Sequence, residues 1–170
     1  MDMDRETWGY FQLWGVLHQT AWAIARNRQN ELRDVGATFM QAAVMVIVKN
    51  VKGPITPAEI SRWLFREPQA VSSLLNQMER KGLLRKARDL ERKNMVRIEL
   101  TEKGEKVYHR SLEKTETLRE IMSCLTKKER YSLERYLLKL RAQALKTLGA
   151  KYRFAPPTTR PYVTVYSEDE

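Results

Sequence analysis

The chain has 170 residues and a formal net charge of +10, because 31 Lys and Arg residues outnumber 21 Asp and Glu residues. This length suits one compact domain, or a small domain with an oligomerisation element, and the positive charge favours nucleic acid or another anionic surface over an acidic partner protein. A single cysteine excludes a disulfide framework, no apolar run is long enough to cross a membrane, and no signal peptide is evident, so we expect a cytoplasmic protein.

A long helix is predicted from Trp8 to about Arg33, in a stretch without proline. A surface helix of a monomer needs one apolar stripe, but this segment carries two ridges and three tryptophans. The ridges are formed by Tyr10, Phe11, Trp14, Leu17, His18, Ala21, Trp22 and Ile24. We expect burial on two sides, one of them against a second copy of the chain. The alternative is an intramolecular bundle in a monomer. The roughly 70 central residues form only a small core, which would cover the three tryptophans poorly.

A strongly apolar helix is predicted next, from a capping box at Thr38 to about residue 50. A helix-turn-helix pattern follows. Its first helix begins with a capping box and a proline at Thr56–Glu59, and its second helix begins at Pro68 and ends at Gly82. One apolar stripe runs along the second helix, formed by Val71, Leu74, Leu75 and Met78.

The opposite face of that second helix is rich in amide and hydroxyl side chains. An ordinary solvated face would favour Glu and Lys, whereas uncharged polar side chains avoid repelling phosphate and can hydrogen-bond base edges. The residues predicted to read DNA from this face are Gln69, Ser72, Ser73, Asn76, Gln77 at the margin, and Arg80.

A basic β-hairpin is predicted after the helix pair, with strands from Leu83 to Arg88 and from Met95 to Leu100 and with Ile55 placed to add a short third strand. Eight basic residues and two acidic ones lie between positions 80 and 97, which favours an electrostatic footprint for DNA over simple solubilisation. The hairpin residues predicted to contact DNA are Lys86, Arg88, Arg92, Lys93 and Asn94. A helix-turn-helix followed by such a hairpin is a winged helix, so double-stranded DNA is the expected partner.

Two more helices are predicted, from Thr101 to about Ser123 and from a capping box at Thr126 to about Leu148. The last helix carries a near-heptad apolar stripe of Leu133, Tyr136 or Leu137, Leu140, Ala144 and Leu148. Residues 151–170 contain prolines and an acidic end, and both a disordered tail and a strap on a neighbouring subunit remain open.

These elements predict a mainly α fold with a small β-hairpin (α+β), a winged helix-turn-helix flanked by long N- and C-terminal dimerisation helices. The expected divisions are an N-terminal dimerisation helix at 1–34, a DNA-binding domain at 35–101, C-terminal dimerisation helices at 102–150 and a proline-containing, acidic-ended tail at 151–170.

The order of elements resembles the MarR family of bacterial transcriptional regulators from about Tyr10 to Leu148. The segments that carry the resemblance are Thr56–Ser61, Val71–Leu75, Met78–Lys86 and Leu100–Gly104. The resemblance implies a homodimer that binds a pseudo-palindromic operator, usually as a repressor released by a small molecule. The chain departs from the family pattern at Gln69, Ala70 and Ser73, and at the hairpin tip, where Arg92-Lys93-Asn94 replaces the usual Asp-Arg-Arg.

The same resemblance implies a site for an aromatic or apolar effector between the long first helix and the DNA-binding unit. The candidate lining residues are Trp14, His18, Trp22, Phe39 and Met45. The alternative is that this aromatic stripe at helical spacing belongs to the hydrophobic core.

No catalytic residue, cofactor or metal site is predicted, because the chain has no nucleophile elbow, phosphate loop or cofactor fingerprint, so an enzyme is not expected. His18, His109 and Cys124 lack the spacing of metal ligands, and a structural role is expected for the cysteine. Two other functions remain as alternatives: a winged-helix module for protein–protein assembly, and a non-specific nucleoid-binding protein.

Overall fold

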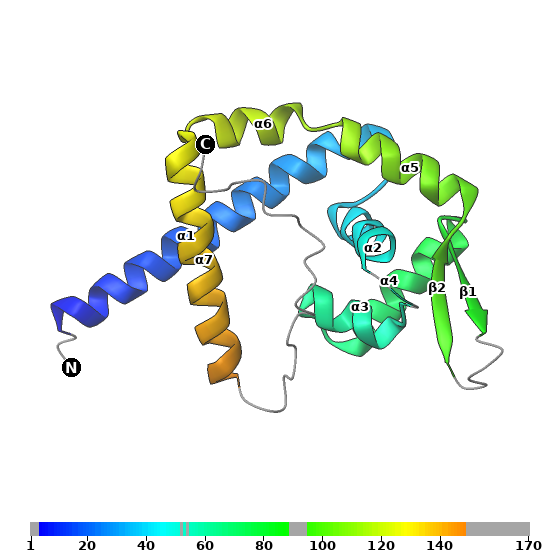
Figure 1. Ribbon diagram of the computed structural model, residues 1–170, viewed down its shortest axis with the longest axis horizontal. Coiled ribbons are helices and arrows are strands. Elements are labelled where there is room, and N and C mark those ends of the chain that lie inside the picture. Colours follow the sequence, from blue (N-terminus) through cyan, green and yellow to red (C-terminus); the bar gives the residue numbers. More distant parts are fainter. Residues whose placement is uncertain (1–3, 52, 54, 89–94, 149–170) are drawn as a thin grey trace.

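The computed structural model describes residues 4–51, 53, 55–88 and 95–148. The elements in chain order are α1 (Arg5–Glu31), η1 (Arg33–Val35), α2 (Phe39–Asn50), α3 (Pro57–Leu64), α4 (Pro68–Arg80), β1 (Leu84–Arg88), β2 (Val96–Leu100), α5 (Glu102–Glu113), α6 (Glu116–Ser123) and α7 (Lys127–Thr147). Helices α2, α3 and α4 and the hairpin form a compact unit at one end of the molecule, which we call the winged-helix unit (residues 39–100) (Figure 1). The long helix α1 extends away from this unit. The predicted mainly α fold with a two-stranded hairpin is confirmed.

The helices begin where their capping residues are. The three predicted capping boxes, at Thr38, Thr56 and Thr126, are all present. Helix α1 begins earlier than predicted because the Asp4 carboxylate accepts a hydrogen bond from the backbone N–H of Thr7 at 2.8 Å, which also lowers the pKa of Asp4.

The core of the winged-helix unit is formed by the predicted apolar stripe of α4 together with α2, α3 and the start of the hairpin. Val71, Leu75 and Met78 are fully buried, and Leu74 is half-buried beside them. Burial of each such side chain stabilises the fold by about 1.5–3 kcal/mol. Other fully buried apolar residues in the described ranges are Leu32, Val44, Met45, Ile60, Leu83 and Leu84. Helix α4 ends at Arg80, and Gly82, predicted to stop it, follows two residues later in a left-handed conformation (φ 68°).

The hairpin is antiparallel, with Leu84 opposite Leu100 and Arg88 opposite Val96. The third strand expected at Ile55 is reduced to one hydrogen bond, in which the backbone N–H of Ile98 donates to the carbonyl of Ile55 at 2.8 Å. The tip residues 89–94 lie outside the described residues, as does the tail from 149 to 170.

The helix predicted from Thr101 to Ser123 is wrong in one respect, because the chain breaks into α5 and α6. At the break, Lys114 leaves the helical conformation with ψ 87°. The local sequence contains neither glycine nor proline there. Instead, side chains of α1 form hydrogen bonds with the backbone at the end of α5 and at the start of α6. Helix α1 also packs against α6.

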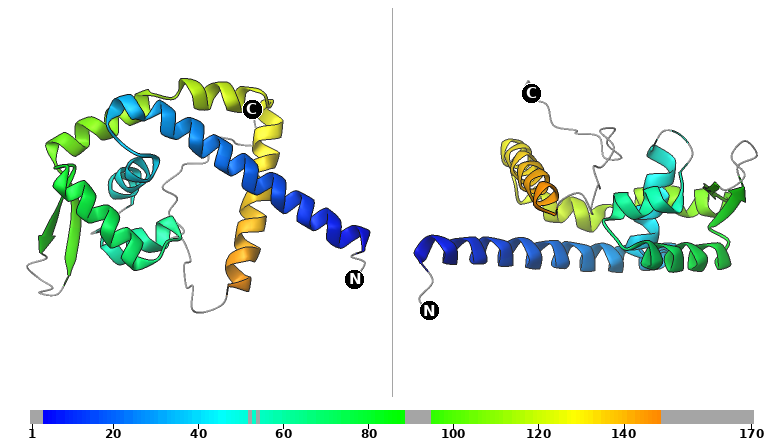
Figure 2. Two further views of the ribbon diagram at one scale, coloured as in Figure 1. Left: turned by 180° about the vertical axis from the view of Figure 1, so that it is seen from behind. Right: turned by 90° about the horizontal axis from the view of Figure 1, so that it is seen from below.

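Helices α1, α6 and α7 have no fully buried residue along their described lengths. Trp14 and Trp22 of α1 are each 65% exposed, and Tyr136 of α7 is 66% exposed. Helix α7 crosses α1 in Figure 1, but the view from below in Figure 2 separates the two. Contiguous exposed apolar surface of this kind is typical of a protein–protein interface. No helix in the described part of the chain is both long and apolar enough to span a membrane.

Candidate nucleic-acid interface

The polar face of α4 is presented to solvent. Its side chains diverge from the buried stripe on the same helix, as the helical spacing predicted. The exposed residues on this face are Gln69, Ser72, Ser73, Asn76, Gln77 and Arg80. Because α4 begins at Pro68 and packs on the core through its opposite side, these side chains are held on a rigid element.

Two of these residues are also bonded within the protein. The hydroxyl of Ser73 donates to the carbonyl of Gln69 at 3.0 Å, one turn earlier. The side-chain oxygen of Gln77 accepts from the amide of Gln41 at 3.1 Å, and Gln41 is fully buried. The ammonium of Lys81 donates to the other end of the same buried amide at 3.3 Å. Gln77 is therefore tied to α2, which fits its predicted position at the margin of the face.

The hairpin and α4 are joined by an ion pair that was not predicted from the sequence. Lys86 of β1 donates to the side-chain oxygen of Asn76 and forms an ion pair of 3.0 Å with Glu79. An ammonium group can only donate, so this contact fixes which end of the Asn76 amide points inward. The NH₂ group is left at the outer end, where it can donate to an acceptor on another molecule. No sequence spacing would have revealed this pair, because it depends on how β1 packs beside α4.

The basic surface continues along β1. Arg88 is exposed at the end of the strand, and Arg85 pairs across the hairpin with Glu99 at 2.8 Å. The predicted hairpin-tip contacts Arg92, Lys93 and Asn94 lie outside the described residues. The described part of the interface is thus a hydrogen-bonding helix face that is uncharged except for Arg80 near its end, with cationic side chains of β1 beside it.

The five residues predicted for an effector site do not gather into one cavity within the single chain. Trp14, His18 and Trp22 lie exposed on α1, where the rings of Trp14 and His18 are 6.0 Å apart. Phe39 is 39% exposed at the start of α2, and Met45 is fully buried in the core. Any site that includes the α1 aromatic residues needs another surface to close it.

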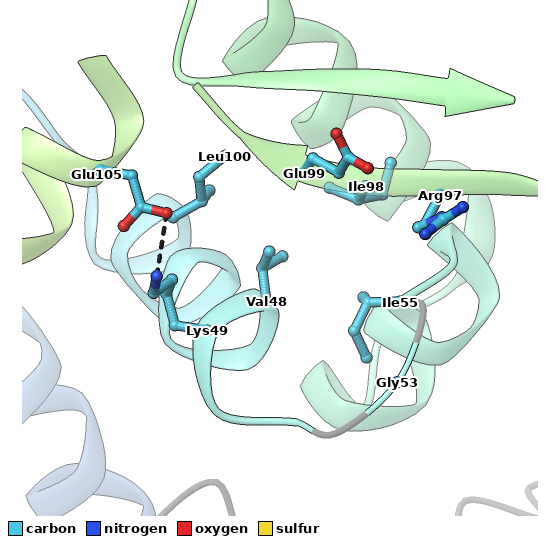
Figure 3. Close-up of a pocket in the computed structure, with 9 residues that line it drawn as sticks. All are labelled: Val48, Lys49, Gly53, Ile55, Arg97, Ile98, Glu99, Leu100 and Glu105. Carbon is cyan, nitrogen blue, oxygen red and sulfur yellow. Dashed lines mark hydrogen bonds and ion pairs between the residues drawn. The ribbon is translucent and has the colours of Figure 1, made fainter. Parts of the chain in front are cut away.

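The structure contains a pocket that was not predicted, with a volume of about 510 Å³, between the end of α2, β2 and the start of α5 (Figure 3). Val48 and Ile55 contribute apolar surface, and an ion pair of 3.1 Å joins Lys49 to Glu105 at one side. None of the five predicted effector residues lines it. None of its lining residues belongs to α4.

The remaining His and Cys residues in the described part of the chain do not form a metal site. Within the described ranges no three His, Cys, Asp or Glu residues are placed to hold a metal ion. His109 is exposed on α5, with its ring 5.2 Å from that of Tyr108. Cys124, expected to have a structural role, is exposed at the C-terminal cap of α6 rather than packed in the core.

Comparison with known proteins gives a consistent picture. The family model described as "MarR family" matches residues 35–93. The organohalide-sensing transcriptional regulator RdhR-CbdbA1625 in its 2,4-dichlorophenol-bound form is 30% identical, with a TM-score of 0.72, and the match covers 79% of this chain and 80% of that one. Its ligand-free form is 28% identical, with a TM-score of 0.79 and coverage of 92% and 90%.

A mutant of MarR from E. coli, complexed with operator DNA, shares the fold at 22% identity, with a TM-score of 0.72 and coverage of 82% of this chain and 99% of that one. No curated protein matches the chain.

Proposed function

The chain belongs to the MarR family of transcription regulators, and from this premise we propose that it binds double-stranded DNA as a homodimer, as a repressor that a small molecule releases. Residues 35–101 would bind DNA, residues 1–34 and 102–150 would form the dimer, and the protein would work in the cytoplasm. The observation that carries this proposal is the exposed, mainly uncharged hydrogen-bonding face of α4 beside the cations of β1.

Helix α4 is proposed to read base edges in the major groove through Gln69, Ser72 and Asn76, with Arg80 near its end. Lys86 holds the oxygen of Asn76, so the amide donates through its NH₂ group. Acceptors at the major-groove edge are guanine N7 and O6, adenine N7 and thymine O4. Lys86 and Arg88 supply positive charge for phosphates, and we propose the same role for Lys93. We propose that Arg92 enters the minor groove and that Asn94 contacts DNA through its neutral amide.

The dimer is proposed to form through the exposed apolar faces of α1 and α7. A two-fold axis places the same patch of both copies in contact, which suits a face that one chain leaves uncovered. Two copies of α4 related in this way would read half-sites about one helical turn apart, ~34–36 Å. A pseudo-palindromic operator follows from that symmetry.

We expect the purified protein to prefer a small set of genomic fragments over bulk DNA in a gel-shift assay, with an affinity that falls steeply as salt rises. Each phosphate neutralised contributes about −0.9 to the slope of log K against log salt concentration. Selection of bound fragments followed by sequencing would give the operator. Equal binding to every fragment would instead indicate a nucleoid-binding protein, and absence of binding at low salt would favour an assembly module.

We propose that the effector is a small halogenated or otherwise apolar phenol that binds where the α1 aromatic residues meet the partner chain. The support is the ligand of the 30% identical regulator and the concentration of aromatic residues on α1. Three of the four tryptophans lie on α1, so 2,4-dichlorophenol is expected to change the tryptophan fluorescence at concentrations that also release DNA. Trp22→Phe should weaken both responses, and an aliphatic acid of similar size serves as the control. DNA release without any change in fluorescence would place the effector elsewhere.

A further inference from the structure

The break between α5 and α6 lies beside the C-terminal end of α1 (Figure 1). At Lys114 and Thr115 the backbone leaves the helical conformation, so α5 exposes its last carbonyl groups and α6 exposes its first N–H groups at nearly the same place. These two helix ends have opposite partial charges, negative at the end of α5 and positive at the start of α6.

Arg28 of α1 caps the C-terminal end of α5. Its guanidinium donates to the carbonyl oxygens of Ser111 and Lys114, with one nitrogen on each. A cation that hydrogen-bonds these carbonyls satisfies acceptors that the helix itself leaves unpaired. The planar guanidinium suits this role because its donors diverge in a fixed geometry, which a lysine ammonium cannot reproduce.

Glu31, one turn further along α1, caps the N-terminal end of α6. Its carboxylate accepts the backbone N–H of Thr117 at 2.9 Å, and it also pairs with Arg28. The side chains of Arg28 and Glu31 are only 14% and 5% exposed. One partly buried ion pair therefore caps two helix ends at once, and removal of either member leaves the other charge without its partner.

The position of this pair connects two parts of the molecule. Helix α5 starts against the end of α4, where Lys103 donates to the carbonyl of Lys81 at 2.7 Å, so it moves with the winged-helix unit. Helices α1 and α7 carry the exposed faces proposed to form the dimer, and α6 leads into α7. We infer that Arg28 and Glu31 form a joint that fixes the direction of the winged-helix unit relative to the dimer, and thereby the half-site spacing that the dimer accepts. This inference rests on the proposed function as a dimeric DNA-binding protein.

Arg28→Met is the most direct test, because it keeps much of the side-chain length and removes both hydrogen bonds to α5. Arg26→Met is the matched control, since Arg26 is an exposed residue on the same helix. If Arg28→Met fails to fold, Arg28→Lys carries the same comparison, because it keeps the charge next to Glu31 while losing the two-pronged contact.

Binding is measured on the selected operator and on duplexes with one or two base pairs inserted between the half-sites. Wild type and Arg26→Met are expected to prefer the native spacing by about tenfold or more, because each inserted pair rotates and displaces one half-site. In the Arg28 variant this preference should fall to less than about threefold. An unchanged preference in the variant would overturn the joint alone, whereas a wild type indifferent to all duplexes would overturn the proposed function.

A second measurement needs no DNA. Spin labels at Glu67→Cys, in a Cys124→Ser background, report the distance between the two winged-helix units of the dimer. The wild-type and Arg26→Met distance distributions are expected to be narrow, and the Arg28 distribution should be broader or shifted. Identical distributions for all three proteins would refute the joint whatever the outcome with DNA.

Discussion

Replacement of Gly104 by alanine is expected to lower the free energy of unfolding by about 3 kcal/mol or more, which is a large part of the stability of a domain this size. A Cβ atom at position 104 would lie 1.9 Å from the carbonyl oxygen of Leu83 and 2.9 Å from its carbonyl carbon. Both atoms belong to the backbone, so no side-chain rotation relieves the overlap. Either α5 must move away from the hairpin or the strand must shift.

The close approach has a clear cause. Thr101 caps α5 through the N–H of Gly104 and also donates its hydroxyl to the carbonyl of Gly82 at 2.5 Å. These two bonds hold the first turn of α5 against the residues that end α4 and begin β1. A glycine is required there because only a residue without Cβ lets the helix backbone come so near.

Urea or thermal denaturation would measure this effect. Gly9→Ala is the matched control, because Gly9 is also in a helix but has nothing within 4 Å of an added Cβ. Alanine is the better helix former by about 1 kcal/mol, so the control should be as stable as wild type or slightly more stable. A Gly104→Ala protein that unfolds with the wild-type midpoint would show that α5 does not press on the hairpin in solution.

Asn76→Asp is expected to reduce operator affinity by about a hundredfold or more while leaving the fold intact. The change is nearly isosteric, and the new carboxylate can form an ion pair with Lys86, which already contacts this position. The outer donor group is lost, an anion faces the phosphates, and Lys86 is held more tightly to the protein. Loss of one base contact costs about 1–3 kcal/mol, and charge repulsion adds to it.

The control for this variant is Gln143→Glu, the same amide-to-acid change at an exposed position of α7. It should bind the operator nearly as tightly as wild type, and both proteins should melt near the wild-type temperature. Equal losses of affinity in the two variants would mean that net charge alone governs binding. An Asn76→Asp protein with wild-type affinity would remove α4 from the base-reading role.

The winged-helix unit could be predicted from the sequence because its signals are local. Capping boxes at Thr38 and Thr56, and the apolar spacing from Val71 to Met78, each act within one or two helical turns. The outward face of α4 followed from the same spacing. These elements are where local preference and tertiary packing agree.

What the sequence did not reveal depends on residues that meet only after folding. The α5–α6 break is capped from Arg28 and Glu31, more than eighty positions earlier in the chain. The contact of Lys86 with Asn76 depends on the angle between strand and helix. The candidate effector residues on α1 are exposed, whereas Met45 is buried in the core. The sequence could not reveal this difference, because helical spacing identifies a face of a helix but not the surface that will cover it.

The buried amide of Gln41 has one more consequence. Apolar packing is not directional, so an apolar stripe alone would let α4 roll by some degrees about its own axis. The hydrogen bonds from Gln41 to Gln77 and from Lys81 to Gln41 are directional, so they fix the rotation of α4 about its axis. The choice of side chains proposed to enter the groove would therefore be set partly from inside the protein, by the buried side chain of Gln41.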